Sequence, residues 1–85
     1  MKHSIQVEKY NNLVVALINS DFKMVYYNPE LNSVVMEVFN EVELAELIIA
    51  TRNILVEDFY STIKHVCDSS YLVYIYLKDE TKNSM

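Results

Sequence analysis

Few residues in this chain of 85 could carry chemistry. His65 and Cys67 are soft metal ligands, but a zinc site needs three or four ligands at established spacings. The same pair cannot serve as nucleophile and base on a helix, where residues two apart point away from each other. Glu57–Asp58 and Asp79–Glu80 are adjacent carboxylates, which diverge in direction, so solvated charge explains them. We therefore predict no catalytic residue, no metal ligand and no cofactor.

Arg52 is a lone cation in an acidic part of the chain. Residues 30–58 carry seven carboxylates besides it, and this stretch is the source of the overall charge of −5. The arginine either holds a small anion or lays its stem along apolar surface and pairs with a carboxylate of its own helix or of a dimer mate. Both interpretations remain open at this point.

The acidic stretch and the seven tyrosines of the chain predict a surface that binds a protein partner. Carboxylates on a helix face attract a basic partner surface, and tyrosine is a common interface anchor. The alternative is that the tyrosines line the edge of the core beneath the helix. The predicted partner-binding residues are Glu41, Glu43, Glu46, Glu57, Asp58, Tyr74 and Tyr76.

The composition excludes several classes of protein. The chain has no glycine, so it lacks the Gly-rich loops that cradle phosphates and dinucleotides. Its 12 acidic residues against 7 basic ones give the wrong sign of charge for direct nucleic-acid binding. One cysteine cannot form an internal disulfide, and the longest apolar run, Leu13–Ile18, is far shorter than the roughly 20 residues that span a bilayer. We expect a cytoplasmic protein that binds neither nucleic acid directly nor membranes.

Clusters of turn residues divide the chain into segments. Without glycine, every reversal must use Asn, Asp, Ser or Pro. Alternating or β-branched apolar residues between these clusters predict five strands: Ser4–Tyr10, Leu13–Ile18, Phe22–Tyr27, Ser33–Phe39 and Tyr71–Leu77. Because the connections between the first four are short, an antiparallel meander is the simplest pairing.

A helix is predicted to begin at Glu41, since Asn40 and Glu43 have the spacing of a capping box. Steps of three and four from Val42 trace an apolar stripe that reaches Val66 and is interrupted only at Arg52. A continuous helix would be roughly 39 Å long. Either it breaks near residues 51–53, or its excess apolar flank buries against a second copy, and we expect a dimer. That flank consists of Leu44, Leu47, Ile54 and Leu55.

The resulting fold class is α+β, a small antiparallel sheet of three or four strands with one long helix packed on it, in the order β-β-β-β-α-β. Residues 1–85 form a single domain in which 78–85 are a flexible tail. The segment Tyr26–Asn32, followed by Val34–Phe39 and a capped helix, resembles the opening hairpin of SpoIIAA-like regulatory domains. Those domains alternate several strands and helices, so the resemblance implies no fold or site residue for this chain.

Three functions are compatible with these features. The first is a non-catalytic acidic module that binds a protein with a basic surface. In size and charge the chain resembles phage or mobile-element inhibitors, including anti-CRISPR proteins, which implies a decoy that occupies the nucleic-acid groove of a basic enzyme. The second is a small dimeric ligand-sensing or regulatory subunit with an anion held near Arg52. The third is a minor enzyme with a site shared across a dimer.

Overall fold

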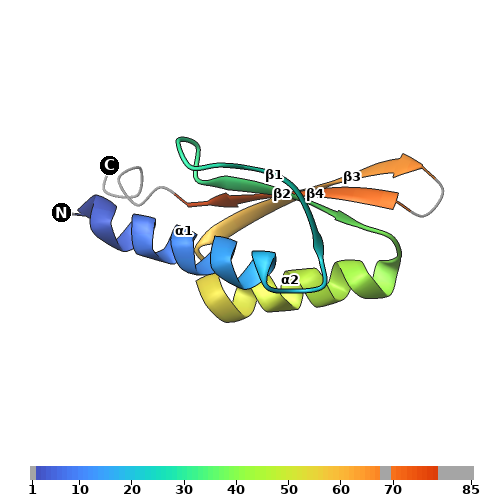
Figure 1. Ribbon diagram of the computed structural model, residues 1–85, viewed down its shortest axis with the longest axis horizontal. Coiled ribbons are helices and arrows are strands. Elements are labelled where there is room, and N and C mark those ends of the chain that lie inside the picture. The colour runs from blue at the N-terminus through green and yellow to red at the C-terminus, as the bar shows by residue number, and fades with distance from the viewer. Residues whose placement is uncertain (1, 68–69, 79–85) are drawn as a thin grey trace.

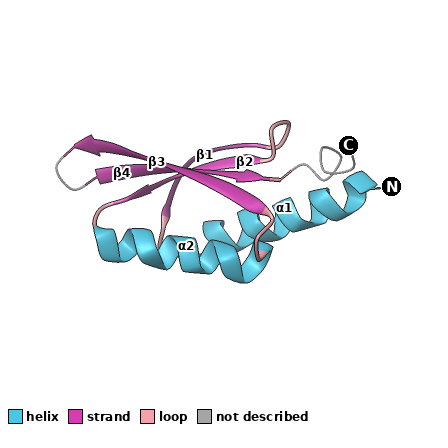
Figure 2. Cartoon of the chain, turned by 180° about the vertical axis from the view of Figure 1, so that it is seen from behind, coloured by secondary structure: helices cyan, strands magenta, loops and turns pink. Residues whose placement is uncertain are grey.

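Two helices and four strands make up residues 2–67 and 70–78, the part of the chain that the computed structural model describes. In chain order they are α1 (Lys2–Ile18), β1 (Lys23–Asn28), β2 (Ser33–Val38), α2 (Glu41–Leu55), β3 (Phe59–Cys67) and β4 (Ser70–Leu77). The strands form one antiparallel sheet in the order β1-β2-β4-β3, and both helices lie on the same side of it (Figures 1 and 2). The α+β class and the antiparallel sheet are confirmed, and the predicted order β-β-β-β-α-β is wrong.

Helix α1 replaces the first two predicted strands. The segments Ser4–Tyr10 and Leu13–Ile18 both belong to it, although the second is rich in β-branched residues. Tyr10, Leu13 and Leu17 are spaced by three and four, and all three are buried. The energy of burying this helical stripe outweighs the strand propensity of single residues, which spans only about 1 kcal/mol.

The predicted helix Glu41–Val66 is two elements. Helix α2 ends at Leu55, and Val56 follows it with a positive φ of 59°, a conformation in which a helix cannot continue. The next segment, Phe59–Cys67, pairs along its length with β4 as strand β3. Its ladder hydrogen bonds and its aromatic and β-branched residues favour a strand. The break therefore lies just beyond the expected 51–53 segment.

Helix α2 buries a different side from the one predicted. The stripe that starts at Val42 and includes Ile49 is exposed, whereas Leu47, Thr51 and Leu55 are buried. The Thr51 hydroxyl donates to the Leu47 carbonyl at 2.9 Å, so this polar group is satisfied within the core. The apolar flank that we expected to bury against a second copy, Leu44, Leu47, Ile54 and Leu55, thus packs in the core of a single chain.

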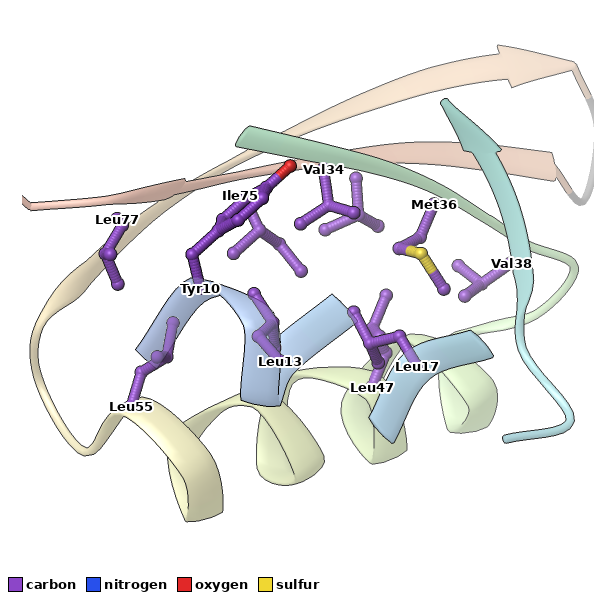
Figure 3. Close-up of a cluster of buried hydrophobic side chains, with 11 residues drawn as sticks. Tyr10, Leu13, Leu17, Val34, Met36, Val38, Leu47, Leu55, Ile75 and Leu77 are labelled. Atoms are coloured by element: carbon purple, nitrogen blue, oxygen red, sulfur yellow. The ribbon is translucent and has the colours of Figure 1, made fainter. Parts of the chain in front are cut away.

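The core lies between the helices and the inner face of the sheet (Figure 3). The predicted alternation in β2 and β4 is confirmed, because alternate residues of each strand are buried and their neighbours point to the other face. The buried apolar side chains are Tyr10, Leu13, Leu17, Val34, Met36, Val38, Leu47, Leu55, Val73, Ile75 and Leu77.

The Asn40 cap predicted at the start of α2 is present, and the reciprocal bond of the predicted capping box is displaced by one residue. The Asn40 side chain accepts a hydrogen bond from the Glu43 N–H at 2.7 Å. The Glu43 carboxylate in turn accepts from the Phe39 N–H at 2.8 Å. The first bond satisfies a backbone donor that the helix itself leaves unpaired, and the second ties the residue before the cap to the first turn of α2.

We expect Asn40→Ala to lower the free energy of unfolding by about 1 kcal/mol, because the capped N–H loses its acceptor. Urea denaturation followed by circular dichroism measures this loss. Asn53→Ala changes an exposed asparagine of the same helix that lies far from the cap, and it should not lower stability. Equal stability of Asn40→Ala and the unmodified protein would contradict a stabilising cap.

Two contacts at Asp58 tie α1 and the end of the described chain to the turn after α2. Lys9 of α1 forms an ion pair with Asp58 in the turn after α2. The Lys78 N–H donates to the Asp58 carbonyl at 2.9 Å. The predicted tail therefore begins with an anchored residue, and its remainder, 79–85, lies outside the described residues.

Candidate functional site

The face of the sheet opposite the helices, which we call the outer face, carries four tyrosines. Tyr74 and Tyr76 alternate with the buried residues of β4, so they point away from the core. Residues paired across antiparallel strands share a face. Tyr60 of β3 pairs with Tyr76, and Tyr26 of β1 pairs with Val35, which itself pairs with Tyr74. The register thus gathers tyrosines from three strands.

Most of this aromatic surface is accessible. Tyr26 and Tyr60 are more than half exposed, and Tyr76 is also exposed. A shallow depression of about 330 Å³ lies between β3 and β4, where Tyr74 and Tyr76 line it beside Thr62. The outer face is therefore a broad, nearly flat aromatic surface and not a deep pocket.

The charges on the outer face are mainly positive. Lys23 forms an ion pair with Glu37 at 3.1 Å, and Lys64 pairs in register with Leu72 of β4. The Lys78 ammonium lies 5.2 Å from the centre of the Tyr60 ring, within the range of a cation–π contact. The acidic character of the whole chain does not extend to this face.

Glu37 is a carboxylate on this face, and its pKa lies below the ordinary glutamate value. The largest cause is the hydrogen bond that the Ser70 hydroxyl donates to it at 2.9 Å, and Lys23 adds to the effect. Both interactions favour the charged form. Glu37 thus links three neighbouring strands of the sheet through its partners.

We expect an NMR titration of the Glu37 carboxyl carbon to give a midpoint below the usual value of 4.5. A carboxylate with a lowered pKa in the folded state stabilises the fold above its unfolded pKa, and this contribution is lost as the pH falls through the folded pKa. Ser70→Ala should move the midpoint upward, and the stability difference between this variant and the unmodified protein should shrink over the same acidic range. A midpoint at or above 4.5 would contradict the observed hydrogen bonds.

The five predicted partner-binding carboxylates do not form one surface. Glu41, Glu43 and Glu46 lie in the first turns of α2, whereas Glu57 and Asp58 follow its last turn, and even Glu46 is about 16 Å along the helix axis from Glu57. The Glu43 carboxylate is engaged in the helix cap, and Asp58 is paired with Lys9. The remaining three are exposed. The structure also separates the α2 carboxylates from Tyr74 and Tyr76, which face away from the helices.

Arg52 lies at a pocket of about 480 Å³ between α2 and β3. Lys78 and the hydroxyl-bearing Ser61 line the same pocket, with Ile48 and Phe59 as apolar walls. Glu57 is also part of the lining, so the site is not purely cationic. The sequence placed Lys78 in a tail and missed it, because only the pairing of β3 with β4 brings the end of β4 beside the turn after α2.

His65 and Cys67, the two soft ligands, both lie on β3 and are exposed. The His65 ring stacks on Tyr71 with 5.0 Å between centroids. Within residues 2–67 and 70–78, no group of three or more His, Cys, Asp or Glu side chains is placed to hold a metal ion. In the same part of the chain, neither helix is long and apolar enough to cross a bilayer.

These features define a class: a two-layer α+β domain with both helices on one face of a four-stranded antiparallel sheet and an aromatic surface on the other. No family model matches the chain, and comparison with curated proteins and with solved structures finds no significant match.

Proposed function

We propose that the protein is a non-catalytic binding module that docks another protein on the outer face of its sheet. The observation that carries the proposal is the group of four tyrosines from three strands, Tyr26, Tyr60, Tyr74 and Tyr76, on the face without helices. Tyrosine rings contribute large contact areas and a polar group that can bond across an interface. Tyrosine is accordingly enriched where protein surfaces meet.

The surroundings of the tyrosines support a protein partner. Two half-buried apolar residues lie on the same face: Val35 between Tyr26 and Tyr74, and Leu72 next to Tyr74 along β4. The result is a mixed apolar and aromatic centre with Lys23 and Lys64 at its margin. An apolar core with a polar rim is the usual composition of a protein–protein interface. A continuous patch of this kind is uncommon on a surface that has no partner.

The acidic decoy is a narrower form of the same proposal, and it would use another surface. A basic enzyme groove would contact the exposed carboxylates Glu41 and Glu46 of α2, not the tyrosines. The two forms can be separated because the structure places these carboxylates and the tyrosines on different sides. We favour the tyrosine surface, since the carboxylates are divided between the two ends of the helix.

The test is capture of partners from nuclease-treated host lysate on the immobilised protein, repeated with variants of adjacent tyrosines. Tyr26→Ala removes an outer-face ring that is 57% exposed. Tyr27→Ala removes a ring that is 47% exposed but shares a face with the buried Val34, and it is the matched control. We expect Tyr26→Ala to reduce retention of a specific protein by about tenfold or more, as a lost interface anchor does, and Tyr27→Ala to leave it unchanged.

A double charge reversal, Glu41→Lys with Glu46→Lys, tests the decoy. If it abolishes capture at moderate salt and Tyr26→Ala has no effect, the partner binds the acidic side and the tyrosine proposal is wrong. Equal loss with Tyr26→Ala and Tyr27→Ala would also contradict it, because such a loss would reflect damage to β1 and not contact on one face.

The second candidate function is a small regulatory subunit that binds an anion at the pocket beside Arg52. The observation in its favour is that Arg52, Lys78 and Ser61 line one pocket. Inorganic phosphate and short carboxylates should then raise the melting temperature, and the increase should grow with the ligand concentration relative to its Kd. Arg52→Ala should abolish the shift, whereas Lys23→Ala, on the outer face, should retain it. An equal shift in all three proteins would rule out this site.

A further inference from the structure

The two edges of the sheet differ in how well they are protected from further pairing. Strand β1 has six residues, and a bulge between Met24 and Tyr26 interrupts it. Strand β3 has nine residues, and its irregularity lies at the far end, between His65 and Cys67. It contains no proline, and Lys64 is its one Lys, Arg, Asp or Glu. Bulges, prolines and charges are what normally prevent an edge strand from pairing, so β3 is the open edge.

An exposed apolar stripe of α2 lies on the same side of the molecule. Val42 and Ile49 of α2 are 68% and 57% exposed, and Val56, just after the helix, is 64% exposed. Steps of three and four connect Val42 to Ile49 through Ala45, and Arg52 follows Ile49 at the same spacing. Arg52 and Val56, which continue the spacing of this stripe, line one pocket with Phe59 of β3, so this side of α2 lies beside β3. Figure 2 shows α2 and β3 together on the near side of the molecule. The open strand edge and the apolar stripe thus form one continuous surface, the α2–β3 surface.

We propose that two copies of this chain pair antiparallel through β3 about a two-fold axis, so that one eight-stranded sheet runs through both copies and each α2 packs on its mate. The sheet layer and the helix layer of one copy have nearly the same width, as this arrangement requires. Four strands about 4.8 Å apart are as wide as two helices about 10 Å apart. Joining two sheets edge to edge therefore brings the two α2 helices into contact. This inference does not depend on the proposed function, which uses the outer face.

The charges of the α2–β3 surface are complementary to those of the same surface in a second, antiparallel copy. Helix α2 has Glu41 in its first turn and Arg52 in its last. Strand β3 begins two residues after Glu57 and carries Lys64 in its second half. Antiparallel pairing sets the acidic end of each element beside the basic end of the same element in the other copy. An isologous interface requires this self-complementarity, and it selects a second copy over an unrelated partner.

The lengths of the two elements place their centres at the same level. Counting from the turn at Glu57, Glu46 lies about 16 Å back along the helix and Thr62 about 16 Å forward along the strand. A two-fold axis that passes near Thr62 in the strand layer therefore passes near Glu46 in the helix layer. Across that axis Glu41 of one copy faces Arg52 of the other. Charge exchange between Glu41 and Arg52 therefore tests whether the two copies pair in this way.

Sedimentation equilibrium of the full chain, at concentrations up to about 100 μM, measures the dimer. We expect a mass of twice the 10.0 kDa of one chain. Glu41→Arg and Arg52→Glu should each weaken the dimer by about tenfold or more, because each places like charges together, and the double variant should restore the affinity to within about threefold. Glu30→Arg reverses an exposed charge in the β1–β2 turn and should have no effect.

Circular dichroism and melting curves show whether each variant folds, since Glu41→Arg also removes a favourable charge from the helix N-terminus. Ile49→Glu is the second disrupting variant and should leave a folded monomer. Amide exchange in residues 60–66 should slow as the protein concentration rises, because strand pairing protects the edge.

Three results would overturn the proposal. The first is a monomer at every concentration. The second is a dimer that survives Ile49→Glu and shows no rescue in the charge-swapped double variant. The third is a dimer disrupted by Tyr26→Ala and not by Ile49→Glu, which would make the outer face the self-association surface. Partner capture that depends on Tyr26 can succeed or fail independently of all three, so the two proposals are distinguishable.

Discussion

Leu47→Ala is expected to lower the free energy of unfolding by about 3 kcal/mol, within the usual range of 2 to 5 for a buried leucine. Leu47 is fully buried on the side of α2 that faces the core (Figure 3). Its replacement removes apolar contacts and leaves a cavity that the surrounding side chains fill only in part. In a domain of this size such a loss is a large share of the total stability. Urea denaturation gives the difference directly.

Ile49→Ala is the matched control for Leu47→Ala, because the two residues lie two positions apart on the same helix and point to different sides. Ile49 is 57% exposed, so its truncation should change the stability of the monomer by no more than about 0.5 kcal/mol. Both variants are compared at low protein concentration, since Ile49 belongs to the α2–β3 surface. A larger cost for Ile49→Ala than for Leu47→Ala would mean that the opposite side of α2 faces the core.

Tyr10→Phe is expected to cost about 1 to 3 kcal/mol, the second largest effect. Tyr10 is buried, and its hydroxyl donates a hydrogen bond of 2.8 Å to the Ser33 carbonyl of β2. The substitution keeps the ring and removes the donor, so a buried carbonyl loses a partner. Tyr27→Phe changes a tyrosine that is exposed and should be nearly neutral. If Tyr10→Phe were equally neutral, the hydrogen bond between α1 and the sheet would contribute nothing to stability.

The stability that Tyr10 contributes should also depend on pH in the alkaline range. Burial raises the pKa of the Tyr10 phenol above its ordinary value of 10.0. A group whose folded pKa is raised contributes stability that is fully present below the unfolded pKa and is lost as the pH rises through the folded pKa. Denaturation curves from neutral pH to above pH 10 should therefore show the gap between the unmodified protein and Tyr10→Phe closing with pH. A gap that does not change would contradict this linkage.

The elements that the sequence predicted correctly are those set by neighbouring residues. The turn at Asn28–Asn32 separates β1 from β2 as expected, and the Asn28 side chain accepts from the Glu30 N–H within it. The cap at Asn40 needs only Glu43, three positions away. The alternation of residues along β4 was sufficient to place Tyr74 and Tyr76 together on the face opposite the core.

The two segments predicted wrongly have residues that suit either helix or strand. Leu13–Ile18 has the β-branched composition of a strand, yet Leu13 and Leu17 also lie on one side of a helix and pack on the sheet. Phe59–Cys67 continues the helical spacing of α2, yet it forms a strand because β4 provides hydrogen-bond partners along it. In both cases the deciding partner is distant in sequence.

The candidate surfaces show the same division. Composition alone shows that the chain is rich in tyrosine and carboxylate, but not that Tyr74 and Tyr76 lie on a different side of the molecule from the carboxylates of α2. Tyr26 and Tyr60 join Tyr74 and Tyr76 only through the strand order and register. Arg52 meets Lys78 only because β3 folds back beside α2. Grouping of residues on a surface depends on contacts between distant segments, which a single sequence does not specify.

By itself the sequence determined the α+β class, the antiparallel sheet, the start of α2 and the alternating faces of β2 and β4. Each follows from hydrogen bonds and hydrophobic periodicity within a few neighbouring residues, where few alternatives compete. Only the tertiary structure decided that residues 2–18 form a helix, that α2 ends at Leu55 and which side of it is buried. Those choices depend on the energy of burying one apolar side rather than another, which exists only once the sheet and helices meet.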